Sequence, residues 1–73
     1  MNKLDLHNTR HQDVSKLIDK FLWDNHDRYP LQIVTGNSQE MKDVVISVLD
    51  EYGHNYQIGD FFGINTGFIQ INS

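Results

Sequence analysis

The segment Leu4–Asn8, LDLHN, holds the side chains of this chain best suited to chemistry. Apolar and polar residues alternate there, which is typical of a half-buried strand. Successive side chains of a strand point to opposite faces, so Leu4 and Leu6 share one face and Asp5 and His7 the other. A carboxylate can orient an imidazole, which can then act as general acid or base. Three readings stay open: Asp5 orients the ring of His7, it bonds the neighbouring backbone, or both side chains simply face water.

Two amphipathic helices are expected to flank this strand. Apolar residues recur at helical spacing over residues 10–26 and again between residues 39 and 52. Thr9 and Gln12 fit a capping box for the first helix, and Asn37 or Ser38 can cap the second. Gly53 suits the residue that follows a helix end.

Three further strands are expected at residues 31–35, 56–62 and 68–72, with the turn GINTG joining the last two. The resulting order is β-α-β-α-β-β within one domain of residues 1–73. A strand–helix–strand unit pairs its strands in parallel, and a short turn pairs them antiparallel. We therefore predict a two-layer α/β sandwich, in which a four-stranded mixed sheet carries two helices on one face.

The first two strands each end just before a helix, at His7 and at Thr35. In open α/β sheets, ligands bind where parallel strands end and helices begin. If these strands are neighbours, LDLHN and the loop TGNS share one rim of the sheet. Free N–H groups at a helix start bind anions, above all phosphate. Gly36 then has two readings, as a plain turn residue or as part of a phosphate cradle.

Composition narrows the classes of protein and of partner. The chain has 73 residues, no cysteine and a net charge of −4, so neither a disulfide nor a thiolate metal site supports it. It has no signal-peptide pattern and no apolar run long enough to span a membrane, so we expect a soluble, cytoplasmic monomer. The acidic balance weighs against non-specific nucleic-acid binding, although Lys3, Arg10 and Lys42 could form a local basic patch.

LDLHN, the helix after it, IVTGNS, the second helix and NTGFIQI together resemble a Smr (small MutS-related) domain, and the resemblance spans residues 4–71. Members usually read LDLHG, so Asn8 departs from the pattern, but Asn tolerates a positive φ. The loop also ends in Asn37 and Ser38, where members carry a basic residue and a glycine.

The resemblance implies an endonuclease that nicks DNA or cleaves RNA, with roles in DNA repair or recombination. It implies that Asp5 and His7 are catalytic and that phosphate is held by the loop Thr35, Gly36, Asn37 and Ser38. Arg10 and Lys42 are the cations that we expect beside this loop.

Other residues leave alternatives open. His11 lies four residues after His7, but no third ligand has suitable spacing, so we expect no metal or other cofactor. Phe61, Phe62 and Phe68 suit either the core or a platform for stacking bases. Trp23 is either partly buried or a contact site. Three functions follow: a nuclease, a non-catalytic nucleic-acid-binding module, and a protein-interaction module that uses the exposed sheet face.

Overall fold

The computed structural model describes residues 2–59 and 67–73. Its elements follow the predicted order and are β1 (Lys3–Asp5), α1 (His11–Asp24), β2 (Leu31–Val34), α2 (Gln39–Tyr52), β3 (Tyr56–Ile58) and β4 (Phe68–Ile71). In these residues, no helix has the length and apolar character needed to cross a membrane.

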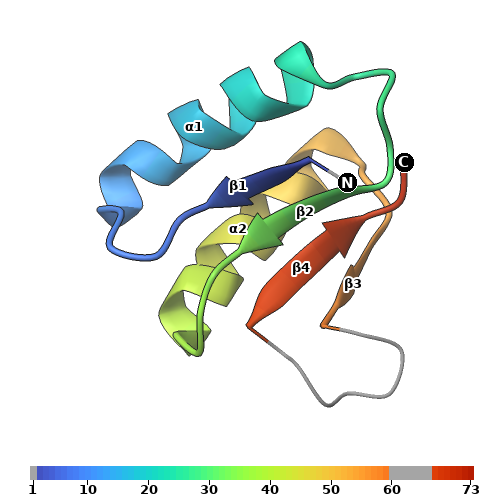
Figure 1. Ribbon diagram of the computed structural model, residues 1–73. Helices are drawn as coiled ribbons and strands as arrows, with labels where there is room; N and C mark the ends of the chain where they lie inside the picture. The colour runs from blue at the N-terminus through green and yellow to red at the C-terminus, as the bar shows by residue number, and fades with distance from the viewer. Residues whose placement is uncertain (1, 60–66) are drawn as a thin grey trace.

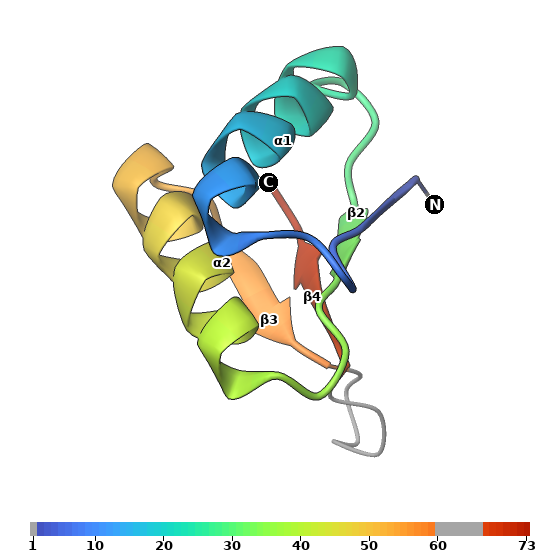
Figure 2. The same cartoon turned by 90° about the vertical axis from the view of Figure 1, so that its left-hand side faces the viewer.

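The strands form one four-stranded sheet in the order β1-β2-β4-β3 (Figure 1). β1 pairs with β2 in parallel, and β4 pairs antiparallel with both β2 and β3. Both helices lie on the same face of the sheet (Figure 2). The predicted mixed sheet with two helices on one face is therefore confirmed, and β2 lies inside the sheet, between β1 and β4.

The core lies between the sheet and the helices because strand residues alternate between the two faces. Leu31 and Ile33 of β2 are fully buried, as are Ile69 and Ile71 of β4. Leu6, just after β1, is also fully buried, so the alternation predicted for LDLH holds. The helices cover these side chains with Val14, Ile18, Leu22, Met41, Val45, Val48 and Leu49. At about 1.5–3 kcal/mol for each large apolar side chain, this burial is the main force that holds the layers together.

The other face of the sheet carries polar residues in register. Lys3 pairs with Gln32, Gln32 with Gln70, and Gln70 with Gln57, so the four form one row across all four strands. A second row joins Asp5 of β1 to Val34 and Phe68. This second row lies nearer the C-terminal ends of β1 and β2 than the first row.

The second helix begins and ends as predicted, whereas the first does not. The Ser38 Oγ accepts a hydrogen bond from the backbone N–H of Met41 at 3.1 Å, and Gly53 follows α2 with a left-handed φ of 74°. The predicted capping box of Thr9 and Gln12 is wrong. Arg10, one residue after Thr9, is the N-cap of α1, and its side chain makes no capping bond. The Thr9 N–H closes a turn onto the carbonyl of Leu6.

Several boundaries are tighter than the sequence predicts. α1 ends at Asp24 rather than at residue 26. Asn25 follows the helix, and both its backbone nitrogen and its side-chain nitrogen donate to the carbonyl of Phe21. The first strand ends at Asp5, so His7 lies in the following turn, and Thr35 lies just after β2. β3 ends at Ile58, and Gly59 lies just after it. Residues 60–62 of the predicted strand 56–62, with Phe61 and Phe62, and most of GINTG lie outside the described residues.

Candidate functional site

The ends of β1 and β2 meet at one rim, as predicted for neighbouring parallel strands. Asp5 lies opposite Val34 in the sheet register. The Leu6 N–H donates to the carbonyl of Val34 at 2.9 Å, which extends the pairing by one residue. The turn that holds His7 and the loop of Thr35, Gly36, Asn37 and Ser38 therefore start side by side.

Asp5 contacts His7 chiefly through the backbone. The Asp5 Oδ1 accepts a hydrogen bond from the His7 backbone N–H at 3.0 Å, while the ring Nδ1 lies 3.7 Å from the same oxygen. Both side chains are about two-thirds exposed. Asn8 adopts a φ of 69°, so the turn keeps the left-handed residue that glycine would supply. The structure thus shows the backbone contact of Asp5, and the imidazole stays open to solvent and to a ligand.

The second loop is attached to the start of β4 through Gly67. The backbone N–H groups of Thr35 and Gly36 both donate to the Gly67 carbonyl at 2.9 Å. Thr35 is buried, and its hydroxyl lies 3.1 Å from the Gly36 carbonyl and 3.3 Å from that of Gly67. Thr35 therefore holds the loop in place. Gly36 supplies the turn with a φ of 67°, and a β-carbon at this position would have no neighbouring atom within 4 Å.

The start of α2 offers N–H groups beyond this loop. Ser38 satisfies the N–H of Met41, and the N–H of Lys42 donates to the Ser38 carbonyl. Within residues 2–59 and 67–73, the N–H groups of Gln39 and Glu40 have no protein acceptor. Such groups, together with the positive end of the helix dipole, favour an anion.

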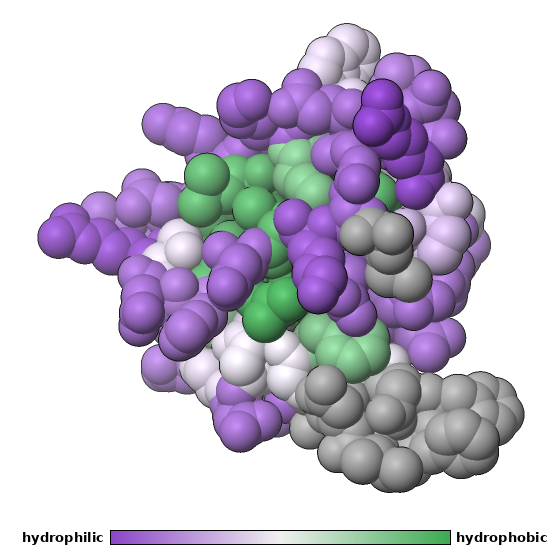
Figure 3. Space-filling model, viewed as in Figure 1, coloured by the Kyte–Doolittle hydropathy of each residue, from purple (hydrophilic) through white to green (hydrophobic). Residues whose placement is uncertain are grey.

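A hollow of about 470 Å³ lies where the open face of the sheet meets this loop. Its described lining comes from Lys3, Gln32, Val34, Gly36, Asn37, Gly67 and Phe68. Figure 3 views the molecule from this sheet side and shows polar side chains around a central apolar area. The hollow therefore combines a cation, amide groups and an aromatic ring.

Only part of the predicted site lines this hollow. Gly36 and Asn37 do so, and Asp5 lies next to it through its pairing with Val34. Arg10 is exposed at the start of α1, and Lys42 is only 8% exposed; neither lines the hollow. The cation there is Lys3, which the sequence offered only as one of three.

Gln32 lines the hollow, and sequence reasoning did not single it out. A signal was present, because Gln32 interrupts the apolar run LQIV with one polar residue, and alternation places it on the open face. Phe68, which had two readings, is half-buried and lines the hollow. Its ring is thus available at the surface of the sheet.

The rim carries both signs of charge within a small area. Lys3 and Asp5 lie on the same face of β1, and Glu40 lies in the first turn of α2. In the described ranges, no group of three His, Cys, Asp or Glu side chains could hold a metal ion. His11, the first residue of α1, is exposed.

Comparisons of the chain with protein-family models, with curated proteins and with solved structures found no match.

Proposed function

We propose that this rim binds the phosphate backbone of DNA or RNA and that the protein is a small endonuclease in which His7 moves a proton. One observation carries the proposal. Lys3 of β1 and the loop residues Gly36 and Asn37, which lead into α2, line a single hollow. Asp5 pairs with Val34 of the same lining, and the turn that carries His7 follows Asp5. The sequence resemblance to Smr domains supports the same assignment.

Phosphate is the ligand that this arrangement of donors suits best. A phosphate near Asn37 would meet the N–H groups of Gln39 and Glu40 and the positive end of the α2 dipole. Lys3 supplies the cation that the loop itself lacks. This pairing of a helix start with a lysine resembles the way that phosphates are held in other proteins.

The hollow also suits the nucleotide that carries the phosphate. Phe68 offers a ring face on which a base can stack, and stacking tolerates any base. The Gln32 and Asn37 amides can donate and accept hydrogen bonds. A nucleotide whose base is unpaired is therefore favoured over a base held inside a duplex.

The chemical step that we assign to His7 is general base catalysis of hydrolysis. Water attacks the phosphorus, one P–O ester bond breaks, and the neutral imidazole takes the proton from the water. The leaving oxygen takes a proton from solvent. The exposed ring of His7 leaves room for both water and substrate, and Asp5 fixes the backbone from which the ring projects.

The test is incubation with end-labelled single-stranded, duplex and branched DNA and with RNA, each with and without EDTA. Endonucleolytic products that persist in EDTA and disappear in the His7→Ala variant support the proposal. Oligonucleotide titration followed by amide chemical shifts gives binding separately, with the signals of Asn37, Gln39 and Glu40 expected to move most.

Non-catalytic nucleic-acid binding at the same hollow is the second candidate. The net charge of −4 favours it, because few cations are available to stabilise a transition state. Shifts at the rim without any cleavage would select this function. Shifts elsewhere on the open sheet face, with none at the rim, would replace both with a protein-interaction module.

A further inference from the structure

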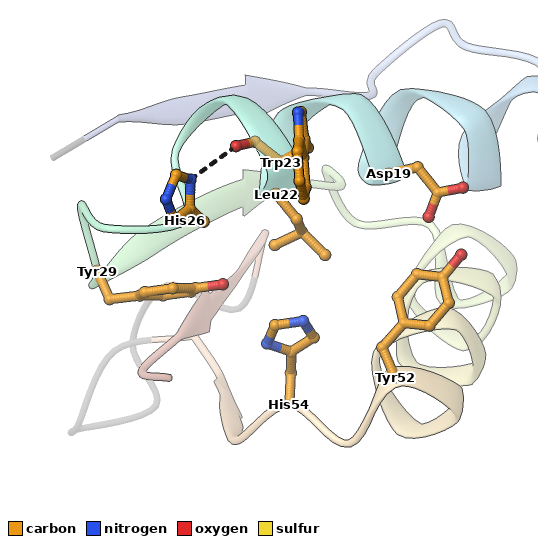
Figure 4. Close-up of a pocket in the computed structure, with 7 residues that line it drawn as sticks. All are labelled: Asp19, Leu22, Trp23, His26, Tyr29, Tyr52 and His54. Carbon is orange, nitrogen blue, oxygen red and sulfur yellow. Dashed lines mark hydrogen bonds between the residues drawn. The ribbon is translucent and has the colours of Figure 1, made fainter.

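A second hollow lies at the opposite end of the helices from the rim, between the last turns of α1 and the end of α2 (Figure 4). Its volume is about 260 Å³, below the usual range for a drug-sized ligand and suited to a single side chain or a similar group. Leu22 of α1 and His54, just after α2, face each other across it. The proposed nucleic-acid site shares no residue with it.

Aromatic rings form much of its lining. Trp23 is 78% exposed, which is unusual for so large an apolar side chain, and its ring stacks on that of His26 with centroids 6.0 Å apart. Tyr29 and His54 form a second ring pair, with centroids 6.1 Å apart. Trp23 is thus exposed rather than partly buried, and its ring is open to a ligand.

A carboxylate gives this aromatic hollow a negative charge. Asp19 lines it from α1, and the hydroxyl end of Tyr52 points toward that carboxylate (Figure 4). Hydrogen bonding to Asp19, with smaller effects of burial and of its charge, raises the pKa of Tyr52 above its ordinary value. The Asp19 carboxylate therefore forms part of the wall of the hollow, beside the Tyr52 hydroxyl.

Both helices also end here without a compensating cation. Neither α1 nor α2 has a basic residue in its last turn, although the C-terminal end of a helix carries negative potential. Lys20 of α1 and Arg28 of the following loop each lie beside a carboxylate. Lys20 bonds Asp24 at 2.9 Å, and the Arg28 Nε lies 4.0 Å from Asp27.

The two histidines present acceptors when they are neutral. The Nδ1 of His26 lies 3.0 Å from the Trp23 carbonyl, and the Nδ1 of His54 lies 3.0 Å from the Ser73 carbonyl. A carbonyl only accepts, so in the neutral tautomer that donates from Nδ1 the Nε2 keeps its lone pair. Figure 4 shows the other nitrogen of His54 on the side of the ring that faces Leu22.

We propose that this hollow binds a guanidinium group, the head of an arginine side chain or of a free arginine derivative. A planar cation can stack on the exposed Trp23 ring, pair with the Asp19 carboxylate and donate to the His54 Nε2. Arginine meets all three conditions. Lysine lacks the plane, and an uncharged urea lacks the charge.

The test compares three ligands of similar shape by following the Trp23 indole, His54 ring and Tyr52 signals in a titration. They are N-acetyl-arginine amide, the citrulline analogue, in which a urea replaces the guanidinium, and the lysine analogue. We expect the arginine compound to bind about tenfold more tightly than the citrulline compound, as a cation–π contact plus a charged hydrogen bond would give. A glycine-flanked arginine peptide distinguishes the source: tighter binding than the free derivative indicates a peptide partner, and equal binding indicates the free compound.

Matched variants assign the effect to this hollow. Asp19→Asn should lower arginine affinity by about threefold to tenfold, and Trp23→Ala should lower it similarly, with little loss of fold because the ring is exposed. Asp13→Asn makes the same change at the other end of α1 and should leave affinity unchanged.

Three outcomes would overturn the proposal. They are equal affinity for the arginine and citrulline compounds, equal affinity for the arginine and lysine compounds, and equal arginine binding by Asp19→Asn and the unchanged chain. Oligonucleotide binding at the rim should be unaffected by Asp19→Asn, so failure of either proposal can be told from failure of the other.

Discussion

The Asp5 carboxylate accepts a hydrogen bond from the backbone N–H of His7 at 3.0 Å, so the residue two positions before the imidazole closes the turn that carries it. Asp5→Ala removes this acceptor and should lower the free energy of unfolding by about 1 kcal/mol. Asp5→Asn keeps an acceptor oxygen and should cost less. Urea denaturation measures both, and equal losses in the two variants would show that the carboxylate's bond is not what stabilises the turn.

His7→Ala should lower the rate of any metal-independent cleavage by about 100-fold or more, the usual contribution of a general base. The fold should be retained, because the ring is about two-thirds exposed and the backbone N–H that bonds Asp5 remains. His11→Ala is the matched control, since it removes a nearby exposed imidazole from the start of α1. Unchanged cleavage in a folded His7→Ala variant would remove His7 from the mechanism.

Lys3→Gln should weaken nucleic-acid binding and reduce its dependence on salt. Each lost phosphate contact lowers the slope of log affinity against log salt by about 0.7 for a single strand. Lys42→Gln is not a clean control, because Lys42 is buried, so the exposed Lys16→Gln on α1 serves instead. If Lys3→Gln and Lys16→Gln change the slope equally, the interaction is with the overall charge and not with the hollow.

Ser38→Ala should lower the free energy of unfolding by about 1 kcal/mol, since its hydroxyl caps α2. Ser38→Asp keeps a capping oxygen and should restore most of that stability. Thr9→Ala is the informative comparison and should change stability by less than about 0.5 kcal/mol, because α1 has no side-chain cap. Thermal or urea unfolding of the three variants measures these differences in stability, and an equal loss in Ser38→Ala and Thr9→Ala would contradict the capping role of Ser38.

The folded protein should lose stability as the pH rises above about 10, the ordinary pKa of tyrosine. Burial raises the pKa of Tyr29, and hydrogen bonding to Asp19 raises that of Tyr52. A pKa raised in the folded state means that the folded chain holds the proton more tightly. The stabilisation is therefore complete below about pH 10 and disappears as pH rises through the folded-state value.

Unfolding measured across this pH range tests the alkaline loss directly. Asp19→Asn should move the Tyr52 titration back toward its ordinary pKa and reduce the alkaline loss. Asp13→Asn, which lies at the other end of α1, should not. A Tyr52 titration that is the same in both variants would contradict the assigned cause.

The sequence by itself determined the features that depend on neighbouring residues. The capping hydroxyl of Ser38 and the left-handed Gly53 lie within a few residues of the bonds that they serve, so local pattern identifies them. Alternation in LDLH correctly buried Leu6 and exposed Asp5 and His7. The order of elements followed from periodicity, because each helix or strand must bury one face.

Tertiary structure decided which of these residues meet. The same local pattern that suits Ser38 also suited Thr9, but Thr9 lies in the turn after Leu6 and α1 begins one residue later, with Arg10 as its cap. Lys3 joins Gln32 only through the parallel register of β1 and β2. That register depends on hydrogen bonds between segments far apart in the chain, which no local spacing records.

The two hollows show the same division. Trp23 and His54 are thirty-one positions apart in the printed sequence and line one hollow only because α1 and α2 pack against the same face of the sheet. Gly36 and Phe68 share the other hollow because β4 pairs with β2. Sequence patterns identify candidate side chains, and the long-range packing of helices and strands sets which of them can act on one ligand.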